Sequence, residues 1–269
     1  MPNLSDTFTK LNLSTRRAIM PFITAGDPDL EFTGQLLLEL DQLSPGLFEI
    51  GFPYSDPIAD GPVIQSSYTR ALANHLKVDQ IFEMMCSISD RMTQPTVAMV
   101  SYAIVLRYGL DRFLEASVKA GFSGLIVPDF LWNSRDPLQG KCQDAGLHLI
   151  PLITPTTPKA RAAIIAKQAT GFIYYVSVAG VTGERTELPR ELADNLTWLR
   201  TQTLTPICVG FGVSGPPQVD QLKPFCDGLI VGSAVMRRVA KLTEDPSLSR
   251  SEVVAEVKSF VESLIQAAE

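Results

Sequence analysis

Glu49 is the residue with the clearest capacity for acid-base chemistry, because it lies inside the apolar run 47–51, Leu-Phe-Glu-Ile-Gly. Successive side chains of a strand point to opposite faces, so Phe48 and Ile50 would pack on one side while the Glu49 carboxylate points the other way. An unpartnered carboxylate is costly to bury, and burial raises its pKa as a general acid requires. We therefore predict an acid-base role for Glu49. The alternative is a structural glutamate whose oxygens are satisfied.

Two further carboxylates follow in the loop 52–62, which reads Phe-Pro-Tyr-Ser-Asp-Pro-Ile-Ala-Asp-Gly-Pro. The prolines restrict the backbone, so Asp56 or Asp60 would be held in a defined place. Either side chain could face Glu49, and either could instead cap its own turn. Residue types alone leave this choice open.

A candidate phosphate site lies at two later strand ends, where 210–214 reads Gly-Phe-Gly-Val-Ser and 232–234 reads Gly-Ser-Ala. Both segments lead into expected helices. Glycines let backbone N–H groups approach an anion, and a helix N-terminus adds a favourable dipole. Plain turns are the alternative. The polar segment 179–189 has the composition of a closing lid or of an ordinary surface loop.

These groups need a scaffold, and the chain alternates short apolar runs with helical periodicity over almost its whole length. The runs predict buried strands at 19–24, 47–51, 96–102, 124–128, 148–153, 172–177, 206–210 and 228–232. Helical or apolar periodicity predicts helices at 30–43, 78–88, 110–120, 159–168, 191–201 and 251–268, and a further segment near 64–73 lies in the long connection between 51 and 96. About eight strand-helix units in 269 residues predict one α/β domain, a (β/α)8 TIM barrel with extra helices spanning 1–269.

Composition excludes several classes of function. The formal net charge of -6 and the lack of a basic stripe argue against nucleic-acid binding. No apolar run approaches the length of a membrane span, and the start of the chain has no secretory pattern, so a cytoplasmic protein is expected. Two histidines leave little material for a histidine metal site. The four cysteines are widely spaced and are predicted to be reduced.

The stretch 49–65 resembles the signature of the tryptophan synthase alpha family almost throughout. The resemblance continues in 22–28, 174–177 and 180–183 and in both glycine motifs, so it covers nearly the whole chain. It implies cleavage of indole-3-glycerol phosphate to indole and glyceraldehyde 3-phosphate without an organic cofactor or metal. It also implies a beta-subunit partner in an alpha2-beta2 heterotetramer.

The resemblance also implies roles for individual residues. Glu49 would exchange protons with the substrate, and Asp60, favoured over Asp56, would hold the indole N–H and stabilise the cationic ring. Other matching positions would line the substrate pocket, namely Phe22, Tyr175 and the lid residue Thr182, and would cradle the phosphate, namely Gly183, Phe211, Gly212, Gly232 and Ser233.

Two loops depart from the family pattern. Ile104 stands where the family usually has asparagine, and 129–134 reads Asp-Phe-Leu-Trp-Asn-Ser where the family has a proline and paired acids. Both loops belong to the surface that meets the beta subunit in the family, and an exposed apolar patch is expected there. The predicted partner interface comprises Tyr54, Asp56, Ile104, Phe130, Leu131 and Trp132.

Three alternatives remain at this level. The first is a stand-alone lyase of indole-3-glycerol phosphate that needs no beta partner. The second is an activating or scaffolding subunit with negligible cleavage of its own. The third is another phosphate-binding barrel enzyme such as a sugar-phosphate isomerase, which the motif at 49–62 disfavours.

Overall fold

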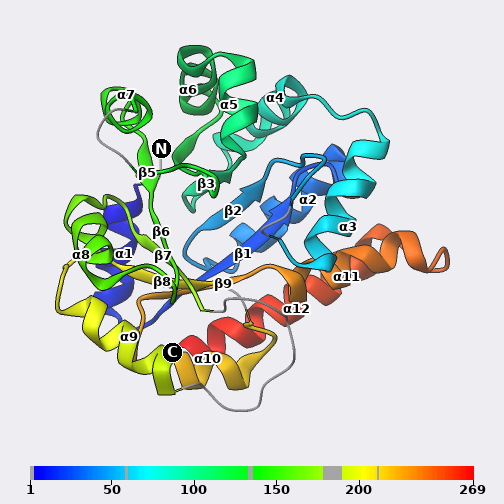
Figure 1. Ribbon diagram of the computed structural model, residues 1–269. Coiled ribbons are helices and arrows are strands. Elements are labelled where there is room, and N and C mark those ends of the chain that lie inside the picture. Colours follow the sequence, from blue (N-terminus) through cyan, green and yellow to red (C-terminus); the bar gives the residue numbers. More distant parts are fainter. Residues whose placement is uncertain (1–2, 58–59, 133–135, 178–189, 211) are drawn as a thin grey trace.

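The computed structural model of the chain describes residues 3–57, 60–132, 136–177, 190–210 and 212–269 (Figure 1). Its strands all pair in parallel and follow the order β5-β4-β3-β2-β1-β9-β8-β7-β6. Their bounds are β1 Ala18–Thr24, β2 Phe48–Gly51, β3 Thr96–Met99, β4 Phe122–Ile126, β5 His148–Ile150, β6 Leu152–Ile153, β7 Ile173–Val176, β8 Ile207–Gly210 and β9 Gly228–Val231.

The two ends of this sheet are consecutive in the chain, because only Pro151 separates β5 from β6. β5 pairs with β4 and β6 pairs with β7. Proline has no N–H to donate, so it interrupts the strand, but its carbonyl accepts a 2.9 Å bond from the Tyr174 N–H and carries the pairing on to β7. The predicted strand 148–153 is thus one strand split by a proline, and it joins the ends of a nearly closed barrel. The TIM-barrel prediction is confirmed.

Helices surround the barrel (Figure 1). Those that follow the strands around it are α2 Leu30–Asp41, α3 Pro62–Ala73, α4 Val78–Ser89, α5 Tyr102–Tyr108, α6 Leu110–Lys119, α7 Leu138–Asp144, α8 Lys159–Gln168, α9 Arg190–Arg200, α10 Pro216–Leu222 and α11 Ser233–Glu244. The last, α12 Arg250–Ala268, begins at a capping box formed by Ser249 and Glu252. The apolar residues of α12 lie on one face of the helix and are buried. No helix in the described ranges is long and apolar enough to cross a bilayer.

The sequence patterns indicate no helix for α3, α5 or α7, and none for the first helix of the chain, α1 Leu4–Leu13. Its apolar residues form only a short stripe, Leu4, Phe8 and Leu11, in an otherwise polar segment. The Phe8 ring packs 6.0 Å from Phe172 at the start of β7, so α1 covers the amino end of the barrel. The carboxyl ends of the strands are therefore where the site is to be sought.

The expected strand at 96–102 ends early, at Met99. Tyr102 instead begins α5, and its N–H donates a 2.7 Å bond to Asp129 Oδ1 rather than to a neighbouring strand. Cys86, Cys142, Cys208 and Cys226 are free thiols in the structure, and all except Cys86 are buried.

Candidate active site

Glu49 lies on β2 with its side chain inside the barrel and is fully buried. Its register partner on β1 is Phe22. Neither carboxyl oxygen has a hydrogen-bond partner among the described residues. Burial, followed by the charge of Asp60, raises the pKa of Glu49 to about 8. A carboxyl group with this pKa holds its proton at neutral pH and is suited to general acid chemistry.

Asp60 and Asp56 occupy different environments, which resolves the choice left open by the sequence. The Asp60 charge acts on Glu49, and burial raises the pKa of Asp60 itself to about 6. Its Oδ2 atom is buried and unpaired among the described residues, whereas its backbone carbonyl accepts a 2.8 Å bond from Gln65 Nε2. Asp56 is exposed and accepts a 3.2 Å bond from Ser55 Oγ. Asp60 is therefore the loop carboxylate that faces Glu49.

The prediction for Tyr175 is corrected by the position of β7. The Tyr175 hydroxyl hydrogen-bonds Asn195 of α9, so this side chain lies between the barrel and its outer helices. The adjacent Tyr174 points inward: a Cβ atom added to Gly210 would lie 2.4 Å from its hydroxyl. Burial first, and then the charges of Glu49 and Asp60, hold the pKa of Tyr174 well above its ordinary value. Strand alternation along β7 is the signal that separates the two tyrosines.

Phe22 lies inside the barrel between the ends of β2 and β9. A Cβ atom on Gly51 would come within 2.4 Å of the tip of its ring, and one on Gly232 would lie 3.5 Å from its Cβ. The same added atom on Gly51 would be 3.0 Å from the Tyr68 hydroxyl. Sequence analysis did not single out Tyr68, because the residue types in the segment 64–73 do not show which side chains reach the interior.

The two glycine motifs lie side by side, because β8 and β9 are neighbours with Gly210 in register with Ile230. Gly212 has φ +85°, a left-handed conformation that favours glycine, and it is exposed. Gly232 is the N-cap of α11, and Ser233 is the first residue of that helix. Phe211, Thr182 and Gly183 lie outside the described residues, as does the rest of the candidate lid.

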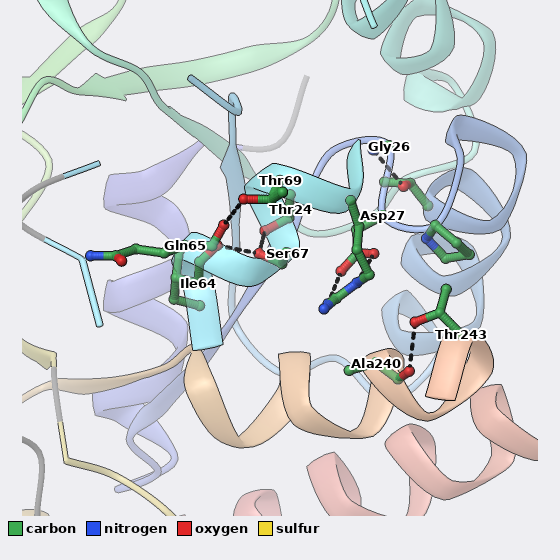
Figure 2. Close-up of polar contacts among 12 residues, drawn as sticks. Thr24, Gly26, Asp27, Ile64, Gln65, Ser67, Thr69, Ala240 and Thr243 are labelled. Atoms are coloured by element: carbon green, nitrogen blue, oxygen red, sulfur yellow. Dashed lines mark hydrogen bonds and ion pairs between the residues drawn. The ribbon is translucent and has the colours of Figure 1, made fainter. Parts of the chain in front are cut away.

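A paired polar network at the end of β1 holds α3 against the barrel, as Figure 2 shows. The Thr24 hydroxyl lies 2.7 Å from Ser67 Oγ, and Ser67 in turn donates to the Ile64 carbonyl at 2.7 Å. The Asp27 carboxylate accepts two bonds from the Arg70 guanidinium, at 2.8 and 2.7 Å. These contacts fix the helix that carries Ile64 and Tyr68 into the site.

The loops predicted to meet a partner differ from expectation. Leu131 is 73% exposed, but Phe130 is only 7% exposed. The Phe130 ring makes edge contacts with Tyr102 at 5.5 Å and with Trp132 at 5.8 Å. The expected three-residue exposed patch is therefore wrong for Phe130, which is buried by its aromatic neighbours. Trp132 and Ile104 are half-buried.

Tyr54, which is also predicted to meet a partner, lies beside the carboxylate site. Tyr54 is half-buried, and its ring packs 5.5 Å from that of Tyr68. Burial and the charges of Asp60 and Asp129 raise the pKa of Tyr54 to about 12. The loop that carries Tyr54 and Asp56 thus connects the surface to the interior of the site.

Comparison with known proteins agrees with this geometry. The family model described as "Tryptophan synthase alpha chain" matches residues 8–267. The tryptophan synthase alpha chain of Rhodopirellula baltica is 45% identical over 274 residues, with 99% of each chain covered, and that of Picosynechococcus is 42% identical over 268 residues, also with 99% of each covered. A crystal structure of tryptophan synthase subunit alpha from Legionella pneumophila superposes with a TM-score of 0.89 at 32% identity, covering 100% of this chain and 98% of that one.

A buried glutamate and a second carboxylate at the carboxyl end of a (β/α)8 barrel thus occur in a chain that matches one family model over almost its full length. The chain belongs to the tryptophan synthase alpha chain family, the lyases that catalyse the alpha reaction of tryptophan biosynthesis.

Proposed function

We propose that Glu49 and Asp60 carry out this reaction, the cleavage of indole-3-glycerol phosphate to indole and glyceraldehyde 3-phosphate. The observation that carries the proposal is the pair itself. Glu49 is buried without a hydrogen-bond partner among the described residues, next to Asp60, and its pKa is raised to about 8. Such a pair is suited to proton transfer at one atom and charge stabilisation at another.

The proposed sequence begins with Glu49 protonated. Glu49 gives its proton to indole C3, and the ring becomes a cationic electron sink that the Asp60 carboxylate stabilises through the indole N–H. The Glu49 carboxylate then accepts the proton of the adjacent glycerol hydroxyl. That oxygen forms the aldehyde carbonyl as the carbon-carbon bond breaks, and the bond electrons return to the ring. Glu49 ends protonated, so protons balance over the cycle.

Substrate binding is proposed to use both sides of the barrel mouth. Phe22 and the inward Tyr174 would line the indole pocket, with Tyr174 taking the place first predicted for Tyr175. The backbone around Gly212, Gly232 and Ser233 would bind the phosphate, with the start of α11 facing the anion. Thr182, Gly183 and Phe211 remain part of the proposal.

A tryptophan synthase beta subunit is the proposed protein partner, in a cytoplasmic alpha2-beta2 complex. Leu131 is exposed beside half-buried Trp132, with half-buried Ile104 on α5 and half-buried Tyr54 on the loop after β2, which is the type of surface that a hydrophobic contact requires. Similarity to relatives named as alpha chains disfavours the stand-alone lyase.

The test is indole release from indole-3-glycerol phosphate by wild type and Glu49→Gln, each with and without a beta subunit from the same source. We expect the kcat of Glu49→Gln to be lower than that of wild type by about a hundredfold to ten-thousandfold, as removal of a general acid predicts. Wild-type turnover should rise when the beta subunit is added. Unchanged cleavage by Glu49→Gln would refute its acid-base role, and wild-type turnover insensitive to the beta subunit would support the stand-alone alternative.

A further inference from the structure

Tyr68 is a buried hydroxyl in this site that the mechanism above does not use. It lies on α3, the helix that begins directly after Asp60, and its side chain is 1% exposed. Its hydroxyl has no hydrogen-bond partner among the described residues. Leaving a buried hydroxyl unpaired is costly, so such a group at a site calls for a functional explanation.

The Tyr68 hydroxyl lies over Gly51. A Cβ atom on Gly51 would lie 3.0 Å from the Tyr68 hydroxyl and 2.4 Å from the tip of the Phe22 ring, so both groups lie over this glycine. Gly51 and Glu49 are two residues apart on β2 and share its inner face. Tyr68 therefore places its polar end inside the pocket, on the Glu49 side of the strand.

The groups that face Tyr68 are mostly acidic. Burial first, then the charges of Asp60, Tyr54 and Glu49, hold the pKa of Tyr68 well above its ordinary value. From β7, Tyr174 also faces this cluster, and from the loop after β4, Asp129 acts on Tyr54. The Tyr68 hydroxyl thus keeps its proton and is a hydrogen-bond donor, and the charge that acts on it most is that of Asp60.

We propose that Tyr68 is a positioning residue for Asp60, with its hydroxyl donating a hydrogen bond to Asp60 Oδ2 when a ligand occupies the pocket. Both atoms are buried, and both lack partners among the described residues. A hydrogen bond to the ionised carboxylate would hold Asp60 charged and oriented toward the indole N–H. This inference rests on the proposed function of Asp60.

The test is Tyr68→Phe, which removes only the hydroxyl. We expect kcat/KM for indole-3-glycerol phosphate to fall about tenfold to a hundredfold at neutral pH, as loss of a hydrogen bond to a charged group predicts. The acid limb of the pH profile should move to higher pH by about one unit, because Asp60 loses a donor that stabilises its charged form. The melting temperature should not fall, because the hydroxyl that is removed has no hydrogen-bond partner among the described residues of the free protein.

The matched control is Tyr108→Phe, which removes a hydroxyl that donates to Asp79 on the outer helical layer. It should leave the acid limb in place. A Tyr68→Phe enzyme with lower melting temperature and an unmoved acid limb would overturn the proposal in favour of a structural role. Lower kcat/KM without a moved limb would also overturn it, in favour of direct substrate contact.

A second measurement separates this inference from the proposed function. NMR titration of the Asp60 carboxyl group with indole bound, in wild type and Tyr68→Phe, needs no turnover. A higher Asp60 pKa in the variant supports the positioning role, and an unchanged value overturns it. Absence of cleavage by wild type would instead refute the proposed function.

Discussion

Asp27 and Glu49 are two buried carboxylates near the carboxyl ends of adjacent strands, and their surroundings are opposite. Asp27 is 1% exposed and accepts two hydrogen bonds from Arg70. Glu49 is 0% exposed and has no partner among the described residues. Burial raises the pKa of both carboxyl groups, but at Asp27 the hydrogen bonds and charge of Arg70 oppose the rise, whereas the charge of Asp60 adds to it at Glu49. Equal burial therefore does not mean equal purpose: the paired Asp27 fixes α3 against β1, and the unpaired Glu49 is suited to proton transfer.

Removal of the Asp27 partner should have the largest effect on stability. Arg70→Met leaves a buried carboxylate uncompensated, and we expect a loss of about 3 kcal/mol in the free energy of unfolding. Denaturant unfolding measures it. The double variant Asp27→Asn/Arg70→Met should recover part of the loss. A loss below about 1 kcal/mol, which is typical of exposed ion pairs, would mean that the buried Asp27 does not depend on Arg70.

Glu49→Gln should act in the other direction, and its effect should depend on pH. The folded pKa of Glu49 is about 8 against an ordinary value of 4.5, so the folded protein retains a proton that the unfolded chain releases in this window. The free energy of unfolding of wild type therefore falls as pH rises from about 4.5 to about 8. Relative to wild type, Glu49→Gln should gain on the order of a few kcal/mol by the upper end of the window.

Unfolding curves at about pH 4, pH 6 and pH 9 measure this difference. A stability gap between wild type and Glu49→Gln that stays constant with pH would show that Glu49 is not held protonated. The same unfolding curves for Asp27→Asn provide the comparison with the buried carboxylate that is paired with Arg70.

The pH dependence of turnover follows from the ionisation of Glu49 and Asp60. Asp60 must be ionised and Glu49 protonated in the free enzyme, so kcat/KM should rise through about pH 6 and fall through about pH 8. Because the two carboxyl groups interact, the two apparent pKa values of this profile describe the pair of groups and not either residue alone. Steady-state kinetics over this range test it. A profile that stays flat above pH 8 would argue against Glu49 as the initial acid.

The smallest effect is expected in the Thr24 and Ser67 contact. Ser67→Ala removes the partner of the buried Thr24 hydroxyl, and we expect about 1 to 2 kcal/mol of lost stability. Thermal unfolding measures it, with Ser87→Ala on the exposed face of α4 as control. An effect equal to that of the control would mean that the paired network does not hold α3.

Much of the fold followed from local patterns. Buried strands of a parallel barrel read as short apolar runs, so their order, and the helices between most of them, were predicted within a few residues. Helix α1 was missed because three buried apolar residues in a polar segment give a weak periodic signal. The extent of β3 was overestimated because Tyr102 is apolar enough to continue a strand, yet its N–H bonds to Asp129.

The sequence by itself determined the barrel class, the inward Glu49 and the family, because these depend on strand alternation and on one long motif. Only the tertiary structure decided that Asp60 rather than Asp56 faces Glu49, that Tyr174 rather than Tyr175 points inward, and that Tyr68 reaches the pocket. Phe130 is buried for the same kind of reason, since one of its two aromatic neighbours, Tyr102, comes from the start of α5, which is distant in the sequence. Which of these side chains is buried in the site depends on contacts between segments that are distant in the sequence. Burial and charge within those contacts then raise the pKa values of Glu49 and Asp60.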